Sequence, residues 1–125
     1  MPTWIHWIGL PHVFGADPAD GQGCDCLLMV WAVLDAAGIH HPPFDPQWLA
    51  LAEAGDWDHL QTLWDAATQP LDGPMQYAVT LFQNGPAGLG VGVVVDDGLL
   101  MVHHRRGVTW MPLNAMRRLT FCSFR

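Results

Sequence analysis

The chain has 125 residues, enough for one domain that buries roughly two-thirds of the surface of its unfolded form. Half of the residues are hydrophobic and 14% are charged, a composition that excludes an intrinsically disordered chain. The formal net charge of −7 disfavours non-specific binding to nucleic acid and to anionic membranes.

Two features of the composition bear on partners. The chain contains seven tryptophans and no lysine, and Trp is enriched while Lys is depleted at protein interfaces. This favours either a surface embedded among other subunits or a Trp-rich core. The basic residues form a second feature, because all of them lie beyond residue 104 and could dock an acidic neighbour or form a solvated face. They are Arg105, Arg106, Arg117, Arg118 and Arg125.

The cysteine count and the N-terminus bear on the compartment. Three cysteines, two of them in the stretch Cys24-Asp25-Cys26, do not make a disulfide framework. The N-terminus lacks a basic region, and the apolar run over residues 4–8 is too short for a signal peptide or a membrane span. We therefore expect no signal peptide and no membrane insertion.

Residues 1–23 indicate a short helix or turn followed by a loop rich in Gly, Pro and Asp. A helix is then predicted over residues 27–37, with Asp25 as its N-cap and Gly38 as its C-cap. Its apolar face consists of Leu27, Val30, Trp31 and Leu34, which recur at helical spacing.

Two further helices are predicted before residue 70. Asp45 followed by Pro46 is typical of a helix start, and Gly55 marks the end of that segment. Asp56 is the expected cap of the next helix. The apolar face of that helix has i, i+3, i+4 and i+7 spacing and consists of Leu60, Leu63, Trp64 and Ala67.

After Pro70 the pattern changes to short apolar runs separated by turn residues. The runs are Met75–Gln83, Gly90–Val95, Leu99–His104 and Gly107–Met111. A hairpin is predicted at Asp96-Asp97-Gly98, and a second turn at Arg106-Gly107. The expected fold is α+β, a single domain over 1–125 in which a mainly helical half (1–70) packs on an antiparallel meander sheet (71–125).

Cys26 is the candidate functional residue. It follows a glycine-rich loop and stands in the first turn of the predicted helix over residues 27–37. Free N–H groups and the helix dipole at such a position lower a cysteine pKa, and a thiolate is the nucleophile that a cysteine hydrolase needs. The alternative is that Cys26 is a small buried hydrophobic residue.

The order of these segments resembles that of the NlpC-type papain-like cell-wall cysteine peptidases over nearly the whole chain. The N-terminal part of the resemblance is the run Trp7–Gly15, then Asp25-Cys26 and an apolar helix ending at Ala37-Gly38-Ile39. The C-terminal part is the series of strands around the Asp-Gly hairpin. The arrangement is similar to the shorter peptidase-like domains of phage tail-tip and tail-assembly proteins.

The resemblance assigns roles to individual positions. Cys26 occupies the position of the nucleophile, and the histidine that serves as general base in the family is replaced by Gly90. His103 fits the third polar residue, which orients the base, although it is one residue late, and His104 is adjacent. His12 stands where the family often has an aromatic residue that lines the site. Because glycine cannot accept a proton, the usual mechanism is not expected here.

Three functions follow as alternatives. The first is a structural or binding module with a degenerate active site, such as a phage tail-tip subunit. The second is an active hydrolase that cuts the stem peptides of peptidoglycan through a thioester, with His12 or His103 as a relocated base and the Cys26 N–H in the oxyanion site. The third is a small metal-binding domain in which Cys24 and Cys26 join His103 and His104 around zinc.

The resemblance also implies partners and a location. The expected partners are other subunits of an assembly, for example of a phage tail, and peptidoglycan. No cofactor is expected. The location would be the virion tail if a phage encodes the chain, and the cytoplasm otherwise.

Overall fold

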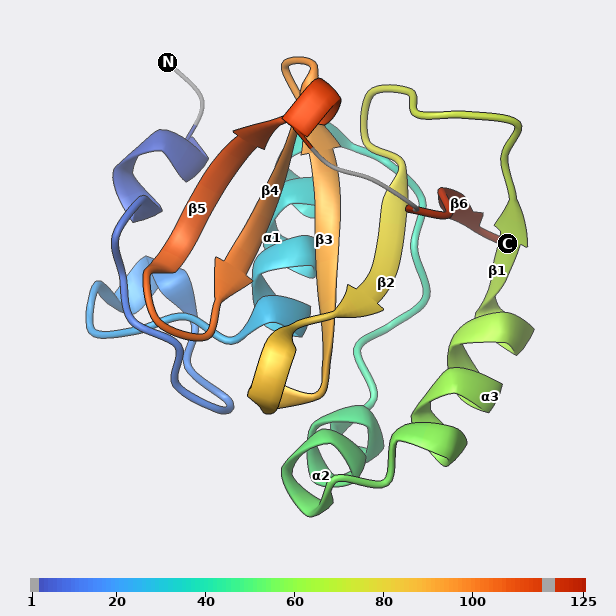
Figure 1. The fold of residues 1–125 in the computed structure, drawn as a ribbon, viewed down its shortest axis with the longest axis horizontal. Coiled ribbons are helices and arrows are strands. Elements are labelled where there is room, and N and C mark those ends of the chain that lie inside the picture. Colours follow the sequence, from blue (N-terminus) through green and yellow to red (C-terminus); the bar gives the residue numbers. More distant parts are fainter. Residues whose placement is uncertain (1–2, 116–118) are drawn as a thin grey trace.

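The computed structural model describes residues 3–115 and 119–125, and it has the predicted order of helices first and antiparallel strands after (Figure 1). The helices are α1 (Cys26–Ala37), α2 (Pro46–Ala54) and α3 (Trp57–Ala67), with short 3-10 helices η1 (Thr3–Trp7), η2 (Pro18–Asp20), η3 (Gly85–Ala87) and η4 (Leu113–Ala115). The strands are β1 (Thr68–Pro70), β2 (Val79–Gln83), β3 (Leu89–Val95), β4 (Gly98–His103), β5 (Gly107–Pro112) and β6 (Cys122–Phe124). The α+β class is therefore confirmed.

Strands β2 to β5 form the predicted meander, in which each strand pairs antiparallel with the next one. The hairpin between β3 and β4 turns at Asp96 and Asp97, whose φ values are 52° and 61°. Two successive positive φ angles are the signature of a type I′ turn, whose twist matches that of the flanking strands. The predicted turn at Arg106-Gly107 is also confirmed, and it connects β4 to β5.

Two short strands that the sequence did not predict extend the meander. The sheet order is β1-β6-β2-β3-β4-β5, so β6 lies between β1 and β2. Thr68 pairs with Phe124 in the β1–β6 ladder, and Val79 of β2 pairs with Cys122. The C-terminal strand therefore joins the end of the helical half to the sheet.

All three α-helices begin at the predicted caps. The Asp45 carboxylate accepts a hydrogen bond from Gln47 N at 2.9 Å, and the Asp56 carboxylate accepts one from His59 N at 3.3 Å. Gly38 and Gly55 end α1 and α2 with φ values of 70° and 72°. This left-handed conformation is available to glycine without the steric penalty that a Cβ introduces.

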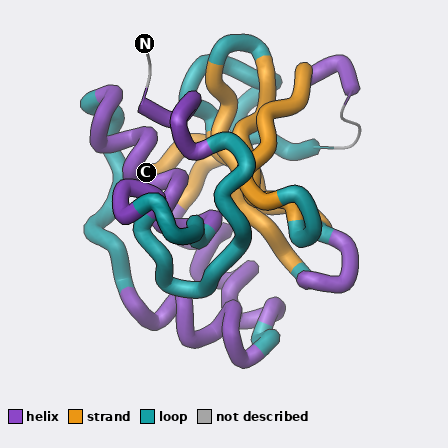
Figure 2. The backbone as a smooth tube through the Cα atoms, turned by 90° about the vertical axis from the view of Figure 1, so that its left-hand side faces the viewer, coloured by secondary structure: helices purple, strands orange, loops and turns teal. Residues whose placement is uncertain are grey.

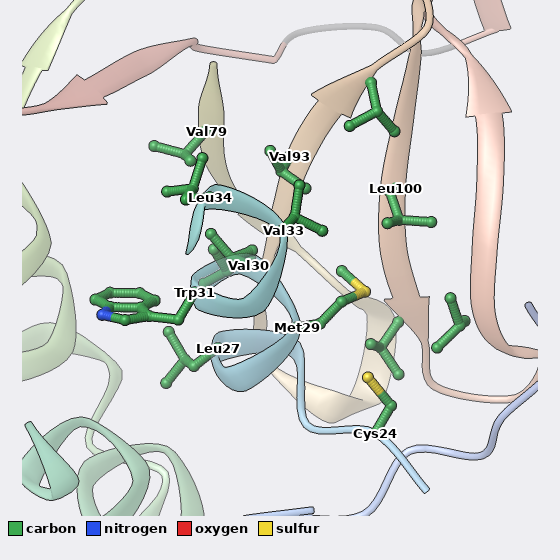
Figure 3. Close-up of a cluster of buried hydrophobic side chains, with 14 of the residues drawn as sticks. Cys24, Leu27, Met29, Val30, Trp31, Val33, Leu34, Val79, Val93 and Leu100 are labelled. Carbon is green, nitrogen blue, oxygen red and sulfur yellow. The ribbon is translucent and has the colours of Figure 1, made fainter. Parts of the chain in front are cut away.

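Helix α1 is buried on two sides, and only one of them is covered by the sheet (Figures 1 and 3). Met29 and Val33 point toward the sheet, where Val93 of β3 is fully buried. Trp31 and Leu27 point away from the sheet, toward α2 and α3. The four residues of the predicted apolar face are all buried, but part of that face packs on the helices instead of the strands. Figure 2 shows the helices gathered mostly to one side of the strands.

An aromatic cluster fills the space between α1, α2, α3 and β6. The Trp31 ring centroid lies 5.5 Å from that of Phe44, 5.7 Å from Trp48 and 5.0 Å from Phe124. Trp64 lies 5.6 Å from Phe124. Aromatic pairs at these separations contribute about 0.5–1.5 kcal/mol each beyond the area that they bury. The cluster therefore explains how a three-residue strand, β6, is held at the end of the chain.

The tryptophan content is accounted for by the protein's own interior. None of the seven tryptophans is exposed: Trp7, Trp31, Trp48 and Trp64 are buried, and Trp4, Trp57 and Trp110 are partly buried. The Trp-rich core is thus the better of the two interpretations of the composition. Of the C-terminal arginines, Arg105, Arg106 and Arg125 are exposed, whereas Arg117 and Arg118 lie outside the described residues.

The N-terminal segment covers part of the β5 edge of the sheet. Gly9 N donates to Val108 O at 2.9 Å, and Val108 N donates to Leu10 O at 2.8 Å. A Cβ at Gly107 would lie 2.0 Å from the Leu10 carbonyl oxygen, so this approach requires glycine. In the part of the chain that the structure describes, no helix is both long and apolar enough to cross a bilayer.

The start of α1 generates a prediction about stability. The buried Asp25 carboxylate accepts hydrogen bonds from the N–H groups of Gly15, Leu27 and Leu28. We expect Asp25→Ala to lower the free energy of unfolding by about 2–3 kcal/mol, because it removes a cap and leaves buried donors without partners. The matched control is Asp45→Ala, which removes one exposed cap and should cost about 1 kcal/mol. Urea denaturation measures both values, and equal losses would contradict the special role of Asp25.

Candidate functional site

Cys26 is the first residue of α1, and its position is fixed by Asp25 immediately before it. Asp25 Oδ1 accepts from Leu27 N at 2.9 Å and from Leu28 N at 3.4 Å, and Asp25 Oδ2 accepts from Gly15 N at 3.1 Å. One carboxylate therefore caps the helix and binds the preceding loop. Burial raises the pKa of Asp25, while these three N–H groups and the nearby His12 act in the opposite direction.

A short parallel pairing brings the N-terminal loop to the site. Cys24 N donates to Pro11 O at 2.8 Å, and Val13 N donates to Cys24 O at 3.2 Å. This makes an isolated parallel bridge between His12 and Cys24. The pairing places His12 beside Cys24, which comes two residues before the start of α1. His12 therefore lies near the start of this helix, although it comes much earlier in the sequence. The predicted proximity of His12 to the Cys26 site is thus present in the structure.

Cys26 is partly buried and lines a small cavity of about 20 Å³. A single water molecule needs roughly 10–15 Å³ measured in this way, so the cavity has room for one water and none for a peptide. The residues around it come from the N-terminal loop, all three helices and the sheet. They are His12, Phe14, Asp25, Cys26, Leu27, Ala52, Trp57, Asn84, Leu89 and Val102.

The environment of Cys26 disfavours the thiolate. Burial, followed by the negative charge of Asp25, raises the pKa of Cys26 to about 12. Backbone N–H groups of Val91, Leu27 and Cys26 itself act in the opposite direction but are outweighed. The expected effect of the helix start is therefore present but smaller than the effects of burial and of the Asp25 charge. The thiol is protonated at neutral pH and is a poor nucleophile.

Leu89 is the residue of β3 that lines the Cys26 cavity. Successive side chains of a strand point to opposite faces of the sheet, and Val91 belongs to the core on the α1 side. A Cβ on Gly90 would meet Phe82 of the cluster on the other face at 3.0 Å, and the Asn84 side chain at 3.2 Å. Gly90, to which the resemblance assigns the position of the base, therefore does not share a face with Leu89, and neither residue has a titratable group.

On β4 the residue that lines the Cys26 cavity is Val102, and the neighbouring Met101 belongs to the cluster on the opposite face. His103 shares the face of Met101 by the alternation of the strand. The structure thus does not bring His103, to which the resemblance assigns the third polar position, to Cys26.

His103 has a local structural role at the turn between β4 and β5. Its Nδ1 accepts hydrogen bonds from Arg105 N at 3.0 Å and Arg106 N at 3.2 Å. Its ring stacks on that of His104 with a centroid separation of 4.4 Å. Partial burial and the positive charges of His104, Arg106 and Arg105 lower the pKa of His103. The imidazole therefore stabilises the turn as a neutral acceptor.

Asn84 is the polar residue of the site that the sequence did not single out. It follows β2, is 9% exposed, and donates from Nδ2 to Val102 O at 3.0 Å. Its own N–H donates to Gly88 O at 2.7 Å. Asn84 lies in a Gln-Asn-Gly-Pro run that is typical of a turn, so nothing in the sequence distinguishes it from a loop residue.

The zinc alternative lacks a ligand set in the described residues. No group of three or more His, Cys, Asp or Glu side chains in residues 3–115 and 119–125 could hold a metal ion. Cys24 is fully buried in the hydrophobic core, and its Sγ donates to Asp25 O at 3.6 Å. Burial raises the pKa of Cys24 to about 12, with the charge of Asp25 adding to the effect. Cys24 is therefore a core residue.

Comparison with protein-family models, curated proteins and solved structures found no match.

The raised pKa of Cys26 predicts slow alkylation. We expect iodoacetamide to modify Cys26 in the folded protein roughly 10-fold or more slowly at pH 8 than in the urea-unfolded chain, because little thiolate is present. The rate should continue to rise above pH 9 without a plateau. Fragment mass spectrometry separates Cys26 from Cys24, and the unfolded chain is the reference. A plateau below pH 7 would contradict the prediction and reveal a thiolate stabilised by a cation.

Proposed function

We propose that this chain is an NlpC-like domain with a degenerate active site, which serves as a structural or binding component of an assembly such as a phage tail tip. One observation carries the proposal: the cavity beside Cys26 holds at most one water, and the strand positions facing it carry Leu89 and Val102. A cysteine hydrolase needs a base within about 3 Å of its thiol and a third group to orient that base. Neither aliphatic side chain can do this.

The architecture supports the family resemblance without a catalytic role. Cys26 begins a helix that packs on the central strands of an antiparallel sheet. This is the arrangement that the resemblance implies for the nucleophile. The thiol is nevertheless protonated, and its surroundings are apolar apart from His12, Asp25 and Asn84. These features support a domain that resembles the family at the helix of the nucleophile and lacks the groups that would activate a thiol.

An apolar surface supports the role in an assembly. Ile5 is 36% exposed and Ile8 is 47% exposed, and both border a hollow of about 420 Å³ between η1 and β5. Trp110 and Arg106 also line this hollow. A surface that combines apolar side chains, a tryptophan and an arginine has the composition favoured at interfaces. Other subunits of an assembly are the partners we propose, and the virion tail is the corresponding location.

A second candidate function is peptidoglycan hydrolysis with a relocated base. It is favoured by one observation, the presence of His12 on the wall of the Cys26 cavity. The cavity would have to open before a stem peptide could reach the thiol. The two functions predict different results in two experiments. The hydrolase would release peptides from cell wall, and its Cys26 reactivity would depend on His12, whereas the degenerate site would show neither effect.

The first test of the proposal is incubation with isolated peptidoglycan. We expect chromatography to detect no released stem peptides, because the thiol is protonated and the strand positions that line its cavity carry Leu89 and Val102. Cys26→Ala is the matched control and should behave like the wild type. Release by the wild type that Cys26→Ala abolishes would overturn the proposal and establish the hydrolase.

The second test rebuilds the missing group. Leu89→His should lower the apparent pKa of Cys26 by about one unit or more, because it places an imidazole on the wall of the cavity. Gly90→His is the comparison variant, since its Cβ would meet Phe82 on the other face and the side chain of Asn84. We expect Gly90→His to change the pKa of Cys26 less than Leu89→His does, and to lower stability. Alkylation against pH measures the first quantity, and a shift caused by Gly90→His alone would refute the assignment of faces.

The third test concerns His12. If the site is degenerate, His12→Ala leaves the alkylation profile of Cys26 unchanged, as does the control His6→Ala at an exposed position. If His12 acts as a relocated base, His12→Ala raises the apparent pKa of Cys26 and lowers any peptidoglycan hydrolysis by about 10²–10⁴-fold. The alkylation profile therefore decides between the two functions even when no hydrolysis is detected.

A further inference from the structure

A second, larger cavity lies away from Cys26, at the other end of α1. It is bounded by η1, the C-terminal part of α1, the segment before β2 and the turn between β3 and β4. Its volume is about 240 Å³, and it shares no lining residue with the Cys26 cavity. The lining residues are Thr3, Trp4, Trp7, Val33, Ala36, Ala37, Gln76, Tyr77 and Asp96.

The side chains around this cavity favour a cation. Three of them are aromatic (Trp4, Trp7 and Tyr77), and one is a carboxylate (Asp96). None of the described lining residues is basic. The faces of aromatic rings attract cations, tryptophan most strongly, and a nearby carboxylate adds to the attraction. The net charge of −7 acts in the same direction over a longer range.

The walls of the cavity are held in place by hydrogen bonds and by core packing. Tyr77 N donates to Val94 O at 2.8 Å, and Asp96 N donates to the Gln76 side chain at Oε1, at 3.0 Å. Tyr77 has a φ of 66°, a conformation that a bulky residue keeps only where its surroundings fix it. Trp7 is 7% exposed and belongs to the core. The backbone at Tyr77 and the Trp7 side chain are therefore in place before any ligand arrives.

We propose that this cavity binds a methylated ammonium group, such as that of choline. A methylated ammonium has no N–H donor on its methyl groups and is recognised by the faces of aromatic rings. Three aromatic side chains, Trp4, Trp7 and Tyr77, line this cavity. The volume is just below the roughly 300–1,000 Å³ of pockets for drug-sized ligands, which suits a headgroup.

The test compares choline with its neutral carbon isostere, dimethylbutanol, by calorimetry and by NMR of the indole N–H signals. We expect choline to bind roughly 10-fold or more tightly than dimethylbutanol, because the two differ only in the charge. Choline should also shift the indole signals of Trp4 and Trp7. Equal affinities for the two probes, or no binding of choline, would overturn the proposal.

Two variants of neighbouring residues distinguish the effect of the Asp96 carboxylate at the cavity from that of the net negative charge of the protein. Asp96→Asn should weaken choline binding roughly 2–5-fold, since an exposed carboxylate contributes modestly to an ion pair. Asn tolerates the positive φ, so the turn is kept. Asp97→Asn is the matched control, because Asp97 belongs to the same turn with a φ of 61° but does not line the cavity. It should leave the affinity unchanged, and an equal effect of both variants would refute a site at Asp96.

A third variant tests the aromatic wall. Trp4→Leu should weaken choline roughly 5-fold or more while leaving dimethylbutanol nearly unaffected, because leucine keeps apolar contact but has no ring. Equal losses for the two probes would contradict the role of the ring. A methylated ammonium could be a free small molecule or a trimethyl-lysine side chain, so a short peptide with trimethyl-lysine is titrated beside choline. The ligand that binds more tightly, choline or the peptide, shows whether the methylated ammonium group belongs to a small molecule or to a protein. The outcome is independent of whether Cys26 is active.

Discussion

The buried Asp25 carboxylate is the constraint on which the arrangement of this protein depends. It binds N–H groups on both sides of the loop-to-helix junction, those of Gly15 in the loop and of Leu27 and Leu28 in α1. The junction fixes where α1 begins, and therefore which of its residues face the sheet. Burying a carboxylate is costly and raises its pKa, and three hydrogen bonds offset part of that cost. The negative charge of Asp25 also adds to burial in raising the pKa of the neighbouring Cys26 thiol.

Much of the fold could be predicted because its signals are local. Each α-helix starts at an aspartate cap, and the hairpin turns at Asp96-Asp97-Gly98, where short-range steric effects decide the structure. Strands β1 and β6 could not be predicted. Each has three residues, and they pair only because Thr68 and Phe124 are brought together by packing that involves the whole chain. A three-residue run has no periodicity from which a strand can be inferred.

The candidate site shows a different limit. The resemblance assigns roles to Gly90 and His103, but the side chains of a strand change face with every residue. Leu89 and Val102, each one position earlier, are the residues that line the Cys26 cavity. Only the packing of the sheet on α1 determines which face of each strand lies on the side of Cys26. His12 reaches the site through a single parallel bridge to Cys24, a contact that has no sequence signal.

The contact between Leu10 and Gly107 has a consequence for association. The outer side of β5 is an edge of the sheet, and Val108 uses its N–H and C=O there to bind Leu10 and Gly9. An uncovered sheet edge is a template on which a strand from another molecule can add. The N-terminal segment thus acts as a cover over the first part of β5. Its displacement would expose a donor and an acceptor at once, and would turn a closed edge into a place for strand exchange between copies.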